Sequence, residues 1–312
     1  MTSAANRAPT SSVTAAAVEA GLRSGRRDWT GMLAALALLT TLVVSLAILF
    51  VLLADVMGRA LPVLSTRGLD FLTAPNSSNP EVAGVGQAVV GSIVLTLFVV
   101  ILALPFGITA AIYLEEYAGD TRFARFVNTN VRNLAGVPAI VYGLLGLAVF
   151  VSAVGLGRSL LAGGMTLAIL VLPIVVITAA EALRAVPLTI REAAFGVGAT
   201  QSEVVTGHVL PYAMPGILTG VVLTLARAFG ETAPLLMVGA ITGVFRTGAD
   251  AGIVERLEGP FTALPTIVYS WAKQPQEEFR ALTAAAIIVL LVVILAVNAG
   301  AILLRNRYDR QW

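Results

Sequence analysis

An arginine and a glutamate stand four residues apart inside one of the chain's long apolar segments. Arg227 and Glu231 belong to the sequence Ala-Arg-Ala-Phe-Gly-Glu-Thr-Ala-Pro, residues 226–234. A charged side chain at the centre of a bilayer costs roughly 3 kcal/mol on insertion scales, so such a pair needs a compensating role. A guanidinium group offers a planar fork of donors that matches the oxygens of an oxyanion. We therefore predict that Arg227 contacts an oxyanion near the membrane midplane. Glu231 would then hold the arginine when the path is empty, or accept a hydrogen bond from a protonated phosphate.

The alternative interpretation of this pair is structural. Opposite charges four residues apart on a helix attract each other, so Arg227 and Glu231 could simply neutralise one another. The two interpretations are compatible in time, because a pair that exchanges partners could serve as a switch in transport.

Small and polar residues lead up to the pair along one helical face. The members of this stripe are Gly216, Gly220, Thr224, Arg227 and Glu231. Glycines four residues apart allow close helix contact, so the stripe predicts a face that looks into a helix bundle and not at lipid. We expect Thr224, Arg227 and Glu231 to line a substrate path, with a bend permitted near Glu231 by Gly230 and Pro234.

The composition is that of a protein that crosses a membrane several times. Of the 312 residues, 57% are hydrophobic and 12% are charged, whereas soluble domains have about 25% charged residues. The chain has no cysteine and one histidine, His208, which argues against thiol chemistry, a His-rich metal site or a Ser-His-Asp enzyme. Its single lysine, Lys273, is outside any glycine-rich phosphate loop. If the protein works against a gradient, another chain must bind ATP and its Mg²⁺, and this chain needs no cofactor.

Apolar runs of about 20 residues are long enough to cross a bilayer as helices. Six such runs are present, at about 31–54, 87–113, 134–154, 162–183, 211–238 and 281–304. Basic residues outside the runs fall mainly in segments on the side of the N-terminus, which predicts cytoplasmic N- and C-termini. The fold class predicted from these patterns is therefore an all-α integral membrane protein with six transmembrane helices.

The remaining segments predict the domain organisation. Residues 1–30 are rich in Ala, Ser and Thr and predict a disordered cytoplasmic tail, followed by a transmembrane domain over 31–312. In the second long outer loop, about 239–280, Tyr269 and Trp271 predict a structured, interfacial segment.

The loop 184–210 between spans four and five predicts two short cytoplasmic helices. Thr189 with Glu192, and Thr200 with Glu203, have the spacing of capping boxes at helix starts. Gly198 stands between them, where a left-handed residue ends a helix.

Within this loop a small apolar surface is expected to enter a groove on a partner. Its members are Ala193, Ala194, Phe195 and Val197.

Three carboxylates near the end of span two could suggest a metal or acid–base site. Glu115, Glu116 and Asp120 stand beside Arg122 and Arg125. A solvated helix end is the interpretation that this local charge pattern favours.

The loop also resembles a known motif. Glu192-Ala193-Ala194, then Gly198, then Leu210-Pro211 is similar to the EAA loop of bacterial ABC importer permeases, although His208 stands where that family usually has Ile. In that family the loop is a coupling helix that docks into the cytoplasmic ATPase subunit. The resemblance implies that Glu192, Ala193, Ala194 and Gly198 carry ATPase coupling.

Within that family the chain resembles PstA, the permease subunits of phosphate-specific ABC importers. The similar segments are residues 136–146, 226–236 and 271–279, and the resemblance runs from about residue 85 to the end. Sulfate and molybdate permeases share Ala-Arg-x-x-Gly-Glu but usually lack the Thr-Ala-Pro that follows here. The resemblance implies the type I ABC importer (MetI-like) fold in the bacterial inner membrane.

The same resemblance implies the partners. They are a second permease subunit (PstC-like), two ATPase subunits (PstB-like), an external phosphate-binding protein (PstS-like), inorganic phosphate and membrane lipid, with no nucleic acid. The alternatives are a permease for sulfate or molybdate, a membrane scaffold that signals phosphate status, and a membrane-embedded enzyme, for which the chain lacks a catalytic cluster.

Overall fold

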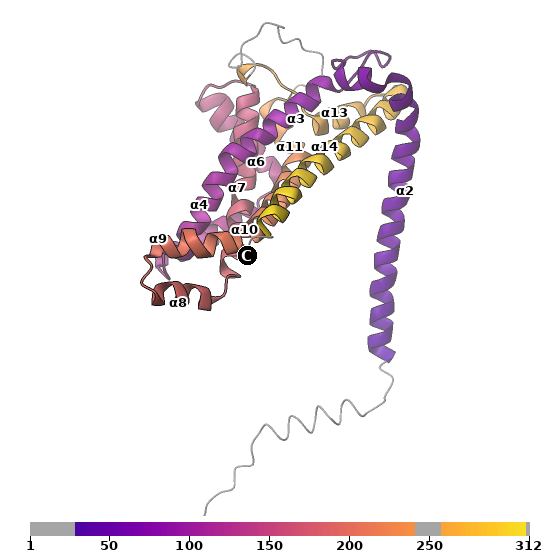
Figure 1. Cartoon of the computed structure of the whole chain (residues 1–312). Helices are drawn as coiled ribbons and strands as arrows, with labels where there is room; N and C mark the ends of the chain where they lie inside the picture. Colours follow the sequence, from indigo (N-terminus) through magenta and orange to yellow (C-terminus); the bar gives the residue numbers. More distant parts are fainter. Residues whose placement is uncertain (1–28, 241–256, 310–312) are drawn as a thin grey trace, which may run out of the picture. The chain divides into compact units, whose positions relative to one another are not determined.

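The computed structural model describes residues 29–240 and 257–309, and within these residues all regular elements are helical (Figure 1). The predicted tail at 1–30 lies outside the described residues except for Trp29 and Thr30, which begin the first helix. The elements, in chain order, are α2 (Trp29–Thr73), α3 (Gly86–Phe98), η1 (Val99–Ala103), α4 (Leu104–Ile112), η2 (Tyr113–Tyr117), α5 (Arg122–Ala135), α6 (Ala139–Gly146), η3 (Leu147–Ala153), α7 (Leu160–Arg184), α8 (Leu188–Gly196), α9 (Gln201–Val204), η4 (Val205–Val209), α10 (Leu210–Gly230), α11 (Ala233–Val238), α13 (Leu264–Trp271) and α14 (Glu278–Asp309). The elements named η are π-helical.

The chain divides into two units, residues 1–54 and residues 55–312. The described part of the first unit is the beginning of α2, residues 29–54, which is apolar and exposed along its whole length. Such a helix is suited to face lipid, because its backbone groups bond one another and its side chains need no polar partner.

In the second unit, the end of α2 packs with α13 and α14 around a tryptophan. Trp271 is 2% exposed, and its indole Nε1 donates to Asn76 Oδ1 over 3.2 Å. Its ring lies 6.3 Å from that of Phe71 and 5.8 Å from that of Phe279. The outer loop predicted to be structured does contain a helix, α13, in which Trp271 completes this core while Tyr269 is 44% exposed. The interfacial placement of this segment stays a prediction.

The second span is one run of helix from α3 to η2, interrupted by two wider π-helical turns. Pro105 is the second residue of α4, which follows η1. Proline has no N–H to donate into the helical ladder, so a wider turn just before it accommodates the missing bond. The span continues to Tyr117, four residues beyond its predicted end.

The third span differs from its prediction. α5 and the run α6–η3 are separated by a bend of 101°, and Pro138 precedes α6 in an extended conformation, with φ −55° and ψ 136°. The predicted span 134–154 was therefore wrong at its start, because proline restrains the preceding residue from helical geometry and the new helix begins at Ala139.

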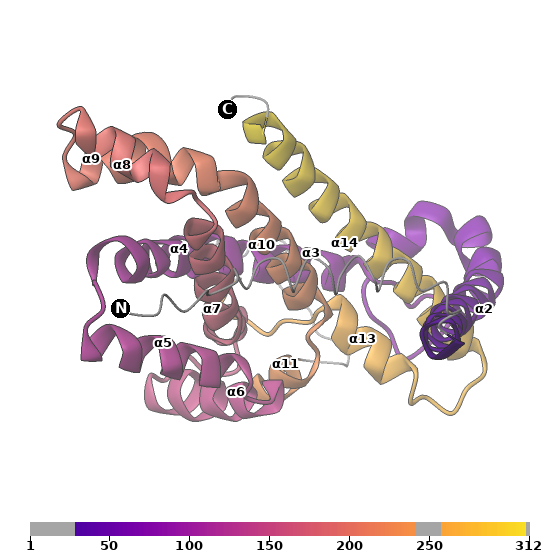
Figure 2. The ribbon, with the colours of Figure 1, turned by 90° about the horizontal axis from the view of Figure 1, so that it is seen from below.

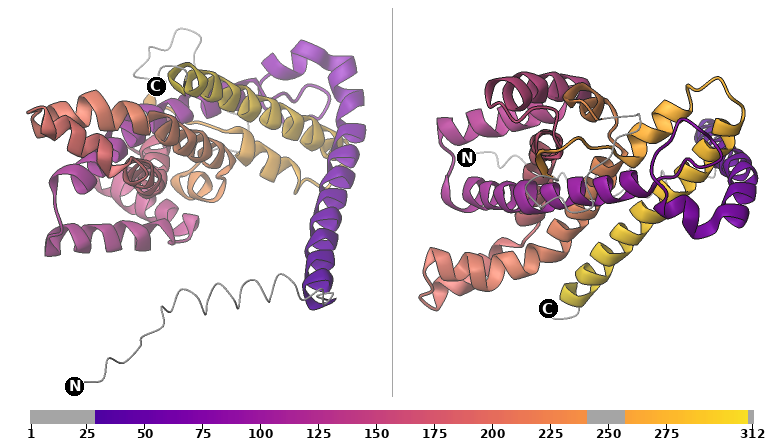
Figure 3. Two further views of the ribbon diagram at one scale, coloured as in Figure 1. Left: turned by 60° about the horizontal axis from the view of Figure 1, so that its bottom comes forward. Right: turned by 90° about the horizontal axis from the view of Figure 1, so that it is seen from above.

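α7 is the central helix of the second unit and carries the largest share of buried residues among its long helices. Its N-terminus is capped by Ser159, whose hydroxyl accepts from the amide of Ala162 over 3.2 Å. α3, α4, α5, α6, α10 and α11 all contact α7, and Figure 2 shows several of them around it. α14 packs along α10 and against α13 (Figure 3).

The fifth span also differs from its prediction. The run predicted at 211–238 is broken, because α10 ends at Gly230 and a short helix, α11, begins at Ala233.

Within the described residues, five helical runs are long and apolar enough to cross a membrane, or six if the bent α5–α6–η3 pair counts as one span. This confirms the predicted all-α architecture, while the cytoplasmic placement of the termini stays a prediction.

Candidate functional site

Arg227 and Glu231 stand on the two sides of the break between α10 and α11. Arg227 lies in the last turn of α10, and Glu231 leaves the helix in an extended conformation with φ −75° and ψ 118°. The guanidinium Nε donates to Glu231 Oε1 over 3.3 Å. The bend expected from Gly230 and Pro234 is therefore present, and the ion pair bridges it.

The arginine of this pair keeps unused donors. Its side chain is 48% exposed and that of Glu231 is 18% exposed. Among the described residues Arg227 hydrogen-bonds only through Nε, so both terminal nitrogens are without a partner there. A cation in the last turn of a helix also interacts favourably with the helix dipole. The geometry thus combines a local ion pair with an open pair of donors.

The N-terminal part of the polar stripe, which contains Gly216 and Gly220, packs against α7, as the small residues predicted. A Cβ added at Gly216 would lie 2.9 Å from Ala182 Cβ, and one at Gly220 would collide with the side chain of Thr178. Thr224, predicted to line the path, is 0% exposed and donates its hydroxyl to Gly220 O over 2.9 Å. Its geometry favours a packing role, so the open part of the stripe begins at Arg227.

The two short helices predicted in the loop are present as α8 and α9, and Gly198 ends the first of them. Gly198 has φ +91°. Its amide donates to Phe195 O over 2.9 Å, and the amide of Ala199 donates to Ala194 O over 3.1 Å. These two bonds form a Schellman motif, which confirms the predicted left-handed C-cap.

One of the two predicted capping boxes forms. The amide of Thr200 donates to Glu203 Oε2 over 2.8 Å, and the amide of Glu203 donates back to Thr200 Oγ1 over 3.4 Å. The box predicted at Thr189 and Glu192 was wrong. α8 begins at Leu188, directly after Pro187, so Thr189 is already inside the helix and makes no capping bond.

One of the four residues predicted to form the apolar surface of the loop, Ala194, does not reach that surface. Ala194 is buried at 6% exposure, because it packs inward among the residues of α7 and η4. Glu192 and Ala193 are exposed, and Leu188, Phe195 and Val197 are 70%, 45% and 86% exposed. The outer side of α8 therefore presents large apolar side chains beside Glu192.

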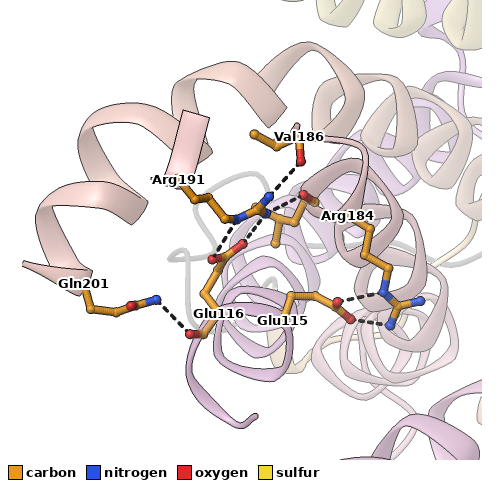
Figure 4. Close-up of polar contacts among 7 residues, drawn as sticks. Glu115, Glu116, Arg184, Val186, Arg191 and Gln201 are labelled. Atoms are coloured by element: carbon orange, nitrogen blue, oxygen red, sulfur yellow. Dashed lines mark hydrogen bonds and ion pairs between the residues drawn. The ribbon is translucent and has the colours of Figure 1, made fainter. Parts of the chain in front are cut away.

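Glu115 and Glu116 do not form the solvated helix end that the sequence favoured. Glu115 Oε2 accepts from Arg184 Nε over 2.7 Å, at the end of α7, and its side chain is 12% exposed. Glu116 Oε1 accepts from Arg191 Nη2, on α8, over 2.8 Å, and its side chain is 5% exposed. Figure 4 shows both pairs side by side. The neighbouring Asp120 does pair with an arginine of α5 in an exposed contact, as the local pattern suggested.

Arg191 is the centre of this network. Besides Glu116, it donates to the backbone oxygens of Val186 over 2.7 Å and Leu183 over 2.9 Å (Figure 4). Gln201, on α9, donates its side-chain amide to Glu116 O over 2.9 Å. Sequence reasoning missed this cluster, and the only signal was two adjacent carboxylates in an apolar chain with too few local partners.

Comparison with known proteins identifies the family to which this helical architecture belongs. Residues 13–310 match the family described as "Binding-protein-dependent transport system inner membrane component". The phosphate transport system permease protein PstA 1 of Mycobacterium tuberculosis is 33% identical over 71% of this chain and 70% of its own length. PstA of Xylella fastidiosa is 34% identical over 78% of this chain and 83% of its own length.

A solved structure supports the fold. A chain of the MetNI methionine ABC transporter, in inward-facing conformations, superposes with a TM-score of 0.55 over 72% of this chain and 94% of that chain. At 17% identity this likeness shows the fold alone, which is the predicted MetI-like permease fold. The helical runs, the EAA-type loop and these matches agree, and the chain belongs to the family of binding-protein-dependent transport system inner membrane components, the permease subunits of ABC importers.

Proposed function

We propose that this chain is the permease subunit of an ATP-driven importer of inorganic phosphate. The observation that carries the proposal is the half-exposed Arg227, whose two terminal nitrogens have no partner among the described residues, at the break that ends α10. The PstA-named relatives, at 33% and 34% identity, support phosphate as the oxyanion.

Arg227 contributes the anion contact in this proposal. A guanidinium can donate two parallel hydrogen bonds to phosphate, and such bonds are stronger than neutral ones because they are charge-assisted. In transporters, substrate sites commonly lie where a membrane helix is interrupted, and the break between α10 and α11 has this character. Glu231 retains Arg227 through Nε, and the terminal nitrogens keep their donors for the anion.

The loop 184–210 contributes the coupling to ATP. Glu192 and Ala193 are exposed on α8, and Gly198 closes the helix in a left-handed turn. Exposed Leu188, Phe195 and Val197 supply apolar area for a groove on a cytoplasmic ATPase subunit. ATP and Mg²⁺ bind to that partner, and this chain holds no cofactor of its own.

The assembly in this proposal contains a second, PstC-like permease, two PstB-like ATPase subunits and a PstS-like binding protein outside the membrane. ATP binding closes the ATPase pair and moves α8. The spans open outward, accept phosphate from the binding protein, and return after hydrolysis.

The test is ATP-driven uptake of radiolabelled phosphate into vesicles that contain this chain and its co-expressed partners, with sulfate and molybdate as competitors. We expect uptake that unlabelled phosphate suppresses and the other two anions leave unchanged. Suppression by sulfate or molybdate would assign the permease to that anion instead. Absence of any ATP-dependent anion uptake by an assembled complex would contradict transport and favour a signalling scaffold.

A further inference from the structure

The strongest unexplained feature is the fork of Arg191, which binds three separate backbone and side-chain partners at once. Its Nη2 reaches Glu116 Oε1 and Leu183 O, its Nη1 reaches Val186 O, and its Nε lies 3.4 Å from Glu116 Oε2. A guanidinium carries five N–H donors in a fixed plane. Arg191 therefore has most of its donors committed inside the chain, in contrast to Arg227.

Burial makes this pair different from a surface ion pair. The side chain of Arg191 is 17% exposed and that of Glu116 is 5% exposed. Exposed ion pairs contribute little, because water and salt screen them. When one partner of a buried pair is removed, the other charge remains in a poorly solvated place, so the loss is much larger. The contact should therefore persist while the surrounding helices move.

The Arg191–Glu116 pair lies beside the ends of the second and fourth spans and the start of the fifth. Glu116 belongs to η2, the last turn of the span that begins at Gly86, and Leu183 belongs to the last turn of α7. Gln201 binds the backbone oxygen of Glu116 from α9, which leads through η4 into α10. Arg191 is also the residue directly before Glu192 on α8. A displacement of α8 thus reaches the ends of the second and fourth spans through the side chain of Arg191, and Gln201 ties the start of the fifth span to Glu116.

We infer that Arg191, with Glu116 as its partner, is the positioning residue that makes α8 and these three span ends move as one body. This inference rests on the proposed function, since it concerns how ATP-driven movement of α8 reaches the path. The fork geometry is the essential part. A lysine in the same place keeps the charge but presents its donors from one nitrogen, so it cannot hold the carboxylate and two separate backbone oxygens together.

The chain offers a matched control in the neighbouring pair. Glu115 and Arg184 have the same chemistry and also start from η2, but they join η2 to α7 and leave α8 untouched. A variant of Arg184 removes one ion pair from the same cluster without cutting the link to the coupling helix.

The experiment compares the reconstituted complex carrying Arg191→Gln, Arg191→Lys, Glu116→Gln or Arg184→Gln with wild type. Two quantities are measured: phosphate transported per ATP hydrolysed, and amide hydrogen exchange over residues 187–199 in the assembled complex. We expect the first three variants to hydrolyse ATP while transport per ATP falls about tenfold or more, the scale of a lost coupling energy. Exchange over 187–199 should accelerate in the same three variants and stay at the wild-type rate in Arg184→Gln, which should keep most of its transport per ATP.

The outcomes separate this inference from the proposed function. If wild type transports no phosphate, the proposed function fails, and exchange over 187–199 still tests the link. If Arg191→Lys transports as much per ATP as wild type, the fork is not needed and the inference is overturned. It is also overturned if Arg184→Gln uncouples as strongly as Arg191→Gln, or if ATP hydrolysis and transport fall in parallel in an assembled complex. If the complex with Arg191→Gln does not assemble, the nearly isosteric Glu116→Gln variant is used to test the inference by the same two measurements.

Discussion

Arg191 and Glu116, 75 positions apart in the sequence, form a buried ion pair in which Nη2 lies 2.8 Å from Oε1. The pair connects the loop that faces the proposed ATPase to the end of the second span. In a second ion pair, Arg227 and Glu231 are only four residues apart, and two guanidinium nitrogens have no partner among the described residues. One arginine is thus committed to holding the structure, and the other is available to a ligand.

Replacing Gly198 by Ala should loosen the end of α8. Gly198 has φ +91°, and a Cβ there would meet no neighbouring atom, so the penalty comes from the backbone conformation alone. A left-handed conformation costs an L-residue roughly 1–2 kcal/mol. We expect the amide of Ala199 to exchange about fivefold to thirtyfold faster.

The control for this change is Gly196→Ala. Gly196 also has open space around it but lies within α8, where alanine is favoured over glycine. Its exchange should be unchanged or slower, and equal acceleration in both variants would show that the left-handed turn is not the cause.

The two threonines of the loop should respond differently to removal of their hydroxyls. Thr200 caps α9 through a reciprocal box with Glu203, whereas Thr189 makes no capping bond. Losing an N-cap costs about 1 kcal/mol, so Thr200→Ala should speed exchange at the start of α9 roughly fivefold. Thr189→Ala should leave exchange at the start of α8 at the wild-type rate. A larger effect at Thr189 would contradict the observed start of α8 at Leu188.

Gly220→Ala should separate α7 from α10. The added Cβ would collide with the side chain of Thr178, a residue in the interior of α7. Forcing an extra methyl into a packed interface typically costs about 1–3 kcal/mol, so the thermal unfolding midpoint of the purified complex should fall. Gly207→Ala is the control, because no atom lies near the position of its Cβ. An unchanged midpoint for Gly220→Ala would mean that the two helices are not in close contact there.

Local patterns in the sequence predicted the elements whose partners are near in the chain. The box at Thr200 and Glu203 and the ion pair of Arg227 and Glu231 depend only on spacing along one helix or turn. The left-handed turn at Gly198 follows from the same kind of local rule.

The contacts between distant segments could not be predicted in this way. Glu115 and Glu116 were predicted to form a solvated helix end, whereas they pair with Arg184 and Arg191 from distant segments. The packing of distant helices determines which arginine each glutamate meets. The burial of Trp271 could not be predicted for the same reason, since Phe71 and Asn76 come from remote segments.

Three of the boundaries that were wrong share another cause, which is proline. Pro187 directly precedes α8, which begins at Leu188, and Pro138 delays the start of the third-span helix to Ala139. At the break after Gly230, Pro234 lies in the first turn of α11. A hydropathy pattern continues through these positions, while the missing N–H and the fixed φ of proline determine where a helix can begin.

The most direct test of the central claim is phosphate uptake by complexes that carry Arg227→Ala, Arg227→Lys or Arg59→Ala. Arg59 and Asp55 form an ion pair with the same four-residue spacing, and Arg59 is about as exposed as Arg227, so Arg59→Ala controls for loss of such a pair. A hydrogen bond to a charged group contributes about 1.5–3 kcal/mol, so Arg227→Ala should reduce uptake at least about tenfold with assembly intact. Arg227→Lys should recover only part of it, and Arg59→Ala should transport like wild type. Wild-type uptake by Arg227→Ala would contradict the claim and make Arg227 and Glu231 a structural pair.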